Sequence, residues 1–418
     1  MKPSYSKTSS QNVAGSRDLA GANGTDVNAH SADVDDVDVI DHGILSARPD
    51  DSAEHVLTEQ ATNQAVTRST EDSPGSIPLA QGLKQSRHNR IRRRGIITGF
   101  LIVLLVAVYA LSLMWGEVFY PPSDVIAVIR GEDVPGASYA VGVLRLPRAT
   151  MGLLAGLAFG AAGVTFQTML RNQLASPDII GISAGASAAG VIGIVIFGMG
   201  QAQVSAVALV ASLLVALAIY LLSYRGGFAG TRLILIGIGV AAMLQSIVTY
   251  ALSQASTWDL PTATRWLTGS LNGATWERAM PLVWAVCILI PIIVVFSRNL
   301  NVLRLGDETA AGLGVRVQST RVALIVSAVI LIAVATAACG PIAFVAFVSG
   351  PIAVRLVGQG GSLFLPSAVV GALVVLIADL AGQFLFGTHY PVGVITGALG
   401  APFLIYLLAR TNRGGSSL

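Results

Sequence analysis

Charged side chains that could bind a partner or move a proton are few in the apolar part of this chain, and they gather at three places. At the first, Arg145 and Arg148 flank Pro147 at the start of an uncharged, glycine-rich stretch. Two fixed cations of this kind either anchor a helix at a membrane surface or receive acidic residues of a docking protein, because rigid charge pairs orient association. The residues by themselves leave both interpretations open.

The second place is Asp379, the single acidic residue within any long apolar run. A carboxylate at the centre of a bilayer costs roughly 2.5–3.5 kcal/mol on insertion scales, which makes such a group a candidate for function. Proton relay is one role, but no histidine or second carboxylate stands beside it in the sequence. A structural role, with the carboxylate hydrogen-bonded to neighbouring helix ends, is therefore favoured.

The third place is the polar segment Leu305–Val315. Gly306 or Asp307 can cap a short helix with an acidic first turn, and Gly312 or Gly314 marks the end of that helix. A helix of this length is too short to be stable alone. We therefore expect it either to pack back on the protein or to dock into another one.

Composition excludes several kinds of catalytic site. A nucleotide-hydrolysing phosphate loop needs a lysine after its glycines, and the only lysines are Lys2, Lys7 and Lys84. The chain therefore has no ATPase site of that kind. Cys287 and Cys339 lie within or at the edge of apolar runs, which does not support a disulfide framework or a zinc site. We expect no catalytic residue, no metal site and no cofactor.

The elements that position these residues are membrane spans. Hydrophobic residues make up 53% of the chain and charged residues 12%, against roughly 25% charged in soluble domains. Residues 1–83 hold 13 of the 23 acidic residues and are predicted to be a disordered cytoplasmic tail. A basic juxtamembrane segment follows at 84–95, then a transmembrane domain over 96–410 and a short cytoplasmic tail over 411–418.

Ten apolar runs are long enough to be candidate spans. The basic segment before the first run and the larger number of arginines in the loops on its side place both termini in the cytoplasm by the positive-inside rule. Glycines recur every four residues at Gly152, Gly156 and Gly160, which predicts close helix packing. The predicted spans are 96–115, 149–170, 179–198, 203–223, 231–253, 280–297, 321–339, 341–357, 364–386 and 391–409.

Several blocks together resemble the FecCD type of permease, the membrane subunit of bacterial ATP-binding-cassette importers for ferric siderophores, haem and cobalamin. The resemblance covers residues 96–410 and implies an all-α fold of about ten helices of the type II importer kind. It also implies a cytosolic ATPase, an extracytoplasmic binding protein and a second permease subunit as partners, and no nucleic acid. The blocks are Arg145–Arg148, Asn172–Asp178 with Gly181–Ala186, Arg265–Leu271, Leu305–Val315, Gly340–Val345, Pro391–Gly393 and Gly400–Phe403.

The resemblance also assigns roles to residues. Arg145 and Arg148 would receive carboxylates of the binding protein. Asn172 and Leu174 would lie at the cytoplasmic gate, with Leu174 closing the exit. The residues that would couple the permease to the ATPase are Gly306, Asp307, Glu308, Ala310, Leu313 and Gly314.

The transport class has one alternative, a proton-coupled secondary transporter that uses Asp379. The segment Leu305–Val315 argues against it, because a secondary transporter does not need a loop for an ATPase. Ferric siderophore is the predicted substrate, with haem and cobalamin as alternatives. The sequence leaves open whether the permease pairs with itself or with a related chain.

Overall fold

The computed structural model describes residues 76–414, apart from 174, 179–180, 224–229, 304 and 359. Residues 77–418 form one compact unit, and all that follows concerns its described part. The predicted disordered tail lies almost wholly outside the described residues. Every regular element in the described residues is helical, which confirms the predicted all-α fold.

Ten apolar helices correspond to the ten predicted spans. Among the described residues, seven helices are long and apolar enough to cross a membrane, and three are shorter. The long ones are α2 (Ser76–Met114), α4 (Leu146–Met169), α6 (Gln201–Ser223), α7 (Gly230–Ser253), α9 (Trp276–Leu303), α11 (Val317–Cys339) and α13 (Phe364–Phe384). The shorter apolar segments lie in α5 (Ile182–Val195), α12 (Val345–Val357) and α14 (Val392–Gly414), and the connecting helices are α3 (Pro122–Ile129), the π-helix η1 (Ser138–Arg145), α8 (Leu260–Thr268) and α10 (Asp307–Gly312).

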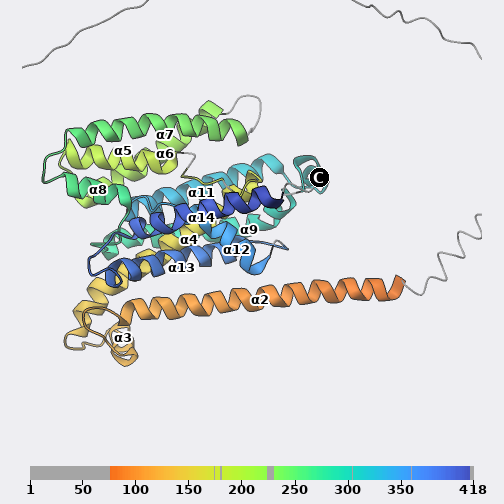
Figure 1. Cartoon of the computed structure of the whole chain (residues 1–418), viewed down its shortest axis with the longest axis horizontal. Coiled ribbons are helices and arrows are strands. Elements are labelled where there is room, and N and C mark those ends of the chain that lie inside the picture. The colour runs from red at the N-terminus through yellow and green to blue at the C-terminus, as the bar shows by residue number, and fades with distance from the viewer. Residues whose placement is uncertain are drawn as a thin grey trace, which may run out of the picture. The chain divides into compact units, whose positions relative to one another are not determined.

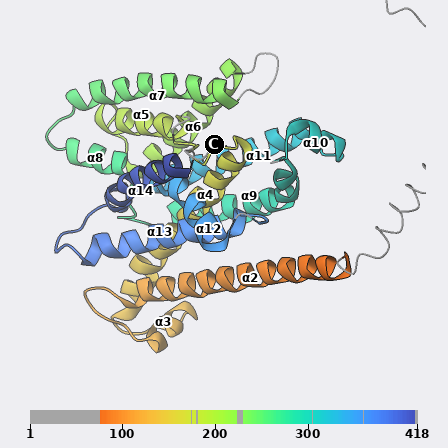
Figure 2. The ribbon, with the colours of Figure 1, turned by 45° about the vertical axis from the view of Figure 1, so that its right-hand side comes forward.

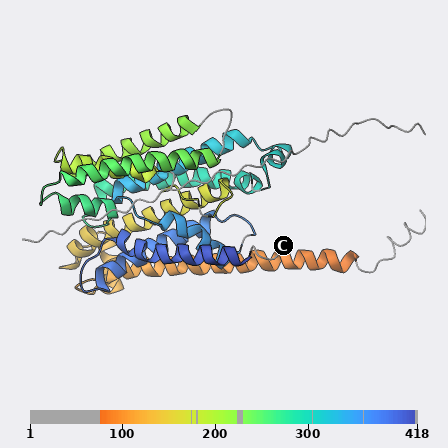
Figure 3. The ribbon, with the colours of Figure 1, turned by 45° about the horizontal axis from the view of Figure 1, so that its top comes forward.

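The bundle has a buried centre and an apolar exterior. Most of α4, α11 and α13 is buried, whereas only about a fifth of the apolar part of α2, α6, α7 and α9 is buried. Figures 1 and 3 show α2 along one side and the α6–α7 pair along the other, with α4 and α11 between them. Large apolar side chains on the outer helices face outward, as a lipid environment requires.

Glycines bring α4 against α13. A Cβ atom at Gly156 would overlap the backbone of Ala372, and one at Gly160 would overlap the carbonyl of Ser367. Gly371 is held equally close to the backbone of α4. Helices without a hydrophobic drive to associate rely on such close backbone contact, so the predicted glycine packing is confirmed at Gly156 and Gly160.

Two of the predicted spans are shorter than the sequence suggested. Helices α5 and α12 have 14 and 13 residues, which makes each about 20 Å long, against a hydrocarbon core of about 30 Å. The residue directly before each helix has a left-handed backbone: Gly181 before α5 has φ 88°, and Phe344 before α12 has φ 66°. Helix therefore covers 182–195 of the span predicted over 179–198 and 345–357 of the span predicted over 341–357, so each helix is shorter than its predicted span by a few residues.

A proline in α12 explains the one glutamine in α4. Pro351 has no N–H, so the carbonyl of Phe347, four residues earlier, loses its helical partner. The Gln167 side-chain amide donates to that carbonyl at 2.9 Å, and Gln167 is buried. A polar side chain in an apolar helix thus satisfies a backbone group that the neighbouring helix cannot.

Candidate functional site

The first residues of α4 form an ion pair with α13. Arg148 donates from Nε to Asp379 Oδ2 at 3.0 Å and from Nη2 to Asp379 Oδ1 at 2.8 Å. Gln383, one turn further along α13, donates to the same carboxylate at 2.7 Å. The predicted structural environment of Asp379 is therefore observed, but its main partner is an arginine 231 residues away rather than a neighbouring helix end.

Arg145 is engaged by the end of α2. Its guanidinium donates to the carbonyls of Leu113, Met114 and Val118 at 2.7–3.1 Å and lies over the ring of Tyr120. A cation at the last carbonyls of a helix is favourable, because those groups have no helical donor and carry the negative end of the dipole. Arg145 thus fastens α2 to the start of α4.

Both arginines line one cleft. It has a volume of about 400 Å³ and lies where the C-terminal end of α2 meets the first turn of α4 and the last turn of α13. Arg148 keeps 22% of its side chain exposed, and its Nη1 atom makes neither bond to Asp379. The acidic, basic and histidine side chains in the lining are Glu117, Arg145, Arg148, Asp379 and His389.

At the C-terminal end of α4 an arginine occupies a position where glycine is usual. Arg171 N–H donates to the Thr168 carbonyl and Asn172 N–H donates to the Gln167 carbonyl, which is the Schellman pattern of helix ends. That pattern needs a left-handed residue, normally glycine, and here Arg171 adopts φ 50°. A non-glycine residue in this region costs on the order of 1 kcal/mol, so the Arg171 side chain must be stabilised elsewhere.

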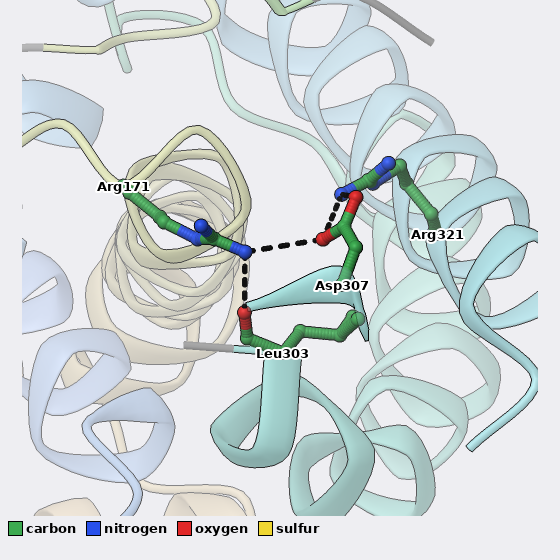
Figure 4. A network of polar contacts seen from close by, with 4 residues as sticks. All are labelled: Arg171, Leu303, Asp307 and Arg321. Atoms are coloured by element: carbon green, nitrogen blue, oxygen red, sulfur yellow. Dashed lines mark hydrogen bonds and ion pairs between the residues drawn. The ribbon is translucent and has the colours of Figure 1, made fainter. Parts of the chain in front are cut away.

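The Arg171 side chain reaches the segment that follows α9. Its Nη2 atom donates to the Leu303 carbonyl at 2.9 Å and to Asp307 Oδ1 at 3.1 Å. Arg321, in the first turns of α11, donates to both oxygens of Asp307 at 3.0 and 3.1 Å. Figure 4 shows the Asp307 carboxylate between the two guanidinium groups.

Helix α10 has the caps that its sequence predicts. It runs over Asp307–Gly312 after Gly306, which adopts φ 116°. At its end Gly314 N–H donates to the Ala311 carbonyl with φ 82° at Gly314. Ala310 is buried, whereas Glu308 and Leu313 are exposed. One face of α10 therefore packs on α9 and α11, and the other carries an acid and a leucine away from the bundle. Figure 2 shows α10 at the opposite end of the bundle from α8.

The two predicted gate residues differ in what the structure describes. Asn172 closes α4 and lines a cavity of about 380 Å³ together with Gln167, Gly350 and Pro351. Leu174 lies outside the described residues. The position of Asn172 between α4 and α12 is thus known, and the role of Leu174 stays a prediction.

A second cavity, lined mainly by apolar residues, lies beside the start of α5. It measures about 450 Å³, with Asp178, Ser183 and Ser187 among its polar residues and Phe344 among its apolar ones. Burial raises the pKa of Asp178 above its ordinary value, while hydrogen bonds with Ser183 and Ser176 lower it by a smaller amount. Asp178 therefore holds its charge less readily than an exposed aspartate.

Three ion pairs were not predicted from the sequence. Arg171 and Arg321 are among the loop arginines that indicate topology, and no partner was predicted for them, nor was the pair of Arg148 with Asp379 predicted. The available signal was the shortage of acids, since a membrane domain with one intramembrane carboxylate and several arginines predicts that the acid is paired. Which arginine pairs with the acid depends on tertiary contacts.

In the described residues no cluster of histidine, cysteine and acidic side chains could hold a metal ion.

The fold is that of a helical, multi-pass membrane protein. Ion pairs lie at both ends of its buried helix α4, with Arg148 at one end and Arg171 at the other. Residues 104–410 match the FecCD transport family. The chain belongs to this family, which consists of permease subunits of ABC transporters that have no ATPase site of their own.

The chain is similar in sequence to several proteins that are named as permeases of iron-chelate transport systems. The chain is 38% identical to the ferric enterobactin transport system permease protein FepG of Escherichia coli (strain K12), over 77% of this chain and 98% of that protein. It is 38% identical to the achromobactin transport system permease protein CbrC of Dickeya dadantii (strain 3937), over 74% of this chain and 90% of that protein. With the iron(3+)-hydroxamate import system permease protein FhuG of Bacillus subtilis (strain 168) the identity is 34%, over 76% and 97%.

The fold also resembles a solved transporter. An inward-facing structure described as a metal-chelate type ABC transporter superposes with a TM-score of 0.66 at 26% identity, over 76% of this chain and 99% of that chain. The predicted family and the permease fold are therefore confirmed.

Proposed function

We propose that this chain is the membrane-spanning subunit of an ABC importer that moves a ferric siderophore into the cytoplasm. An extracytoplasmic binding protein delivers the chelate, and a separate cytosolic ATPase supplies the energy. The chain carries no catalytic residue of its own.

The observation that carries the proposal is the exposed face of α10. Glu308 on this six-residue helix and Leu313 directly after it are exposed, whereas buried Ala310 and the Asp307 ion pairs fix the other face of the helix. A short helix held rigidly at the end of a membrane bundle suits the role of transmitting a partner's movement. The coupling residues are Gly306, Asp307, Glu308, Ala310, Leu313 and Gly314.

The arginine distribution supports an orientation with α10 and both termini on the cytoplasmic side. The cleft with Arg145 and Arg148 then faces outward, where the binding protein docks. Because Arg145 already holds three carbonyls and Arg148 already holds Asp379, docking carboxylates meet cations that are fixed in place. Fixed charges orient a partner at small entropic cost.

Asn172 and Leu174 belong to the cytoplasmic gate in this proposal. The segment that carries them links the end of α4 to the half-length helix α5, so a shift of either helix changes its path. A second permease subunit, either identical or related, completes the pathway, because exposed apolar faces on the bundle need lipid or another bundle to cover them.

Ferric siderophore is the proposed substrate because the similar permeases are named for ferric enterobactin, achromobactin and hydroxamate transport. Haem and cobalamin remain the competing substrates. Each of the three is too large for a narrow ion channel, which agrees with a pathway formed between two subunits.

Uptake of radioactive iron tests the proposal. Cells without their own siderophore permeases receive the chain with its ATPase and binding protein, and are supplied with several ferric siderophores. We expect Glu308→Ala to lower uptake about fivefold or more, the lower range of allosteric coupling. Glu132→Ala removes another exposed acid, between α3 and η1, and should leave uptake unchanged.

The same assay separates the alternatives. Asp379→Asn keeps hydrogen-bonding capacity but removes the charge, so a proton-coupled transporter would lose uptake with this change and tolerate Glu308→Ala. No iron uptake by wild type, together with uptake of haem or cobalamin, would replace the substrate but keep the transporter class. Equal effects of Glu308→Ala and Glu132→Ala would refute the role of α10.

A further inference from the structure

Arg171 has two features that fold stability alone does not require. Its backbone is left-handed at a position where glycine is the favoured residue. Its side chain bonds to Leu303 and Asp307, more than 130 residues away in the chain. A glycine would close α4 without backbone strain but could make neither contact. The strained conformation therefore places a guanidinium where it meets the segment between α9 and α11.

The two arginines on Asp307 do different work. Arg321 is only 14 residues from Asp307 and has an 11% exposed side chain, so it fixes α10 to the start of α11. Arg171 is 49% exposed and comes from the end of α4, the most buried long helix. If Arg171 is removed, Asp307 keeps Arg321, and α10 keeps its buried face. What is lost is the bond between α10 and α4 (Figure 4).

Helix α4 is suited to carry displacement from one end to the other. It has 24 residues, which makes it about 36 Å long, and it contacts α13 backbone to backbone at Gly156 and Gly160. Arg148 fixes its other end to Asp379. A helix packed in this way moves as a rigid body, because a close-packed interface is not continuously deformable.

We propose that Arg171 is a positioning residue that ties the α10 helix to α4, so that movement of α10 reaches the Asn172 segment and the arginine cleft at the far end. This inference rests on the proposed role of α10 in coupling. It adds a specific connection inside the permease, between the end of α4 and the segment that follows α9. Arg321 keeps Asp307 oriented for that connection.

Three substitutions of Arg171 separate the tie from the fold. Arg171→Gly removes both the contacts and the backbone strain, Arg171→Gln removes the charge, and Arg171→Lys keeps a charge without the planar fork. Each is assembled with the ATPase and the binding protein in lipid vesicles. The measurements are ATP hydrolysis with and without the loaded binding protein, substrate uptake, and the thermal stability of the purified assembly.

For Arg171→Gly we expect unchanged thermal stability and unchanged basal ATP hydrolysis. The stimulation of hydrolysis by loaded binding protein should fall about fivefold, the lower limit of coupling between sites, because both side chains of the pair are 49% exposed and solvent screens them; uptake should fall with it. Arg171→Gln should reduce the stimulation to a similar degree, and Arg171→Lys should recover part of it. The matched control is Arg130→Gln, which removes an exposed arginine from the end of α3.

A double-mutant cycle tests the route of the effect. Because Arg171 acts through Asp307, Arg171→Gln combined with Asp307→Asn should be no worse than the more damaging single change. Additive losses would overturn the proposal, and so would wild-type stimulation in Arg171→Gly. A loss that tracks lowered thermal stability would also overturn it, since the residue would then be structural.

Failure of the proposed function has a different signature. In that case Glu308→Ala leaves hydrolysis and uptake unchanged in an otherwise wild-type chain, and the Arg171 proposal is overturned together with the role of α10. If Glu308→Ala is damaging and Arg171→Gly is silent, the coupling helix stands and only its connection to α4 is refuted.

Discussion

The ion pair of Arg148 with Asp379 allows a quantitative prediction. Asp379→Leu leaves a guanidinium without its carboxylate at the edge of the membrane domain, and Arg148→Met leaves a carboxylate with only the Gln383 amide. Arg148→Met combined with Asp379→Leu replaces both charges by apolar groups of similar length. The cycle of these variants measures the interaction itself.

Burial decides the expected size of that interaction. The side chains are 22% and 7% exposed, so solvent screens the pair only weakly. Removing one partner of a buried pair costs about 3–5 kcal/mol, and the partial exposure of Arg148 points to the lower limit, about 3 kcal/mol, for Asp379→Leu. Replacing both partners is often close to neutral, because neither charge is then left unpaired. An exposed pair would contribute only about 0–1 kcal/mol.

The free energy of unfolding is followed by detergent titration of the purified chain in mixed micelles, with helix content as the signal. We expect the double variant to be at least about 1 kcal/mol more stable than Asp379→Leu, because the double variant leaves no charge unpaired. Gln383→Leu is the control, and it should cost about 1 kcal/mol or less because it removes one neutral donor. Additive single and double effects would show that the pair is not coupled, and the burial argument would be refuted.

Three further predictions concern packing, a backbone carbonyl and a partly buried acid. Gly156→Val should destabilise the bundle by about 1–3 kcal/mol through overpacking against α13. Gly397→Val is the control, because a Cβ atom there would meet no atom within 4 Å; thermal unfolding of the two variants compares them. Gln167→Leu leaves the Phe347 carbonyl without a donor and should cost about 1–3 kcal/mol, whereas restoring the α12 donor with Pro351→Ala in the same chain should recover part of that loss. The pKa of Asp178 is raised in the fold, so stability should fall as pH rises from the pKa of the unfolded chain to the pKa of the folded one. The melting temperature measured against pH should show this decline, and Asp178→Asn should abolish it. The same pH profile in wild type and Asp178→Asn would contradict the prediction.

Sequence reasoning succeeded where one local pattern was sufficient. The ten apolar runs predicted ten apolar helices, because a polypeptide in lipid must satisfy its backbone within each segment. The ends of α10 were predicted from Gly306, Gly312 and Gly314, since caps depend on residues within one turn. The glycines of α4 predicted close packing because no side chain stands between the backbones.

Sequence reasoning failed where an element depends on another element. The lengths of α5 and α12 were overestimated, because an apolar run does not show where backbone leaves the helix once neighbouring helices protect it from lipid. The Gln167 contact was missed for the same reason, since the unsatisfied carbonyl belongs to a helix 180 residues away.

The sequence by itself determined the membrane class, the family, the number of apolar segments and the absence of a lysine-containing nucleotide loop. These follow from composition and from motifs, which are local properties of the chain. Only the tertiary structure decided which charge meets which. Arg148 meets Asp379 and Arg171 meets Asp307 across separations of 231 and 136 residues, because helix packing sets which side chains lie within a few ångströms, and Coulomb attraction and hydrogen bonding act only at that range inside a screened, close-packed protein.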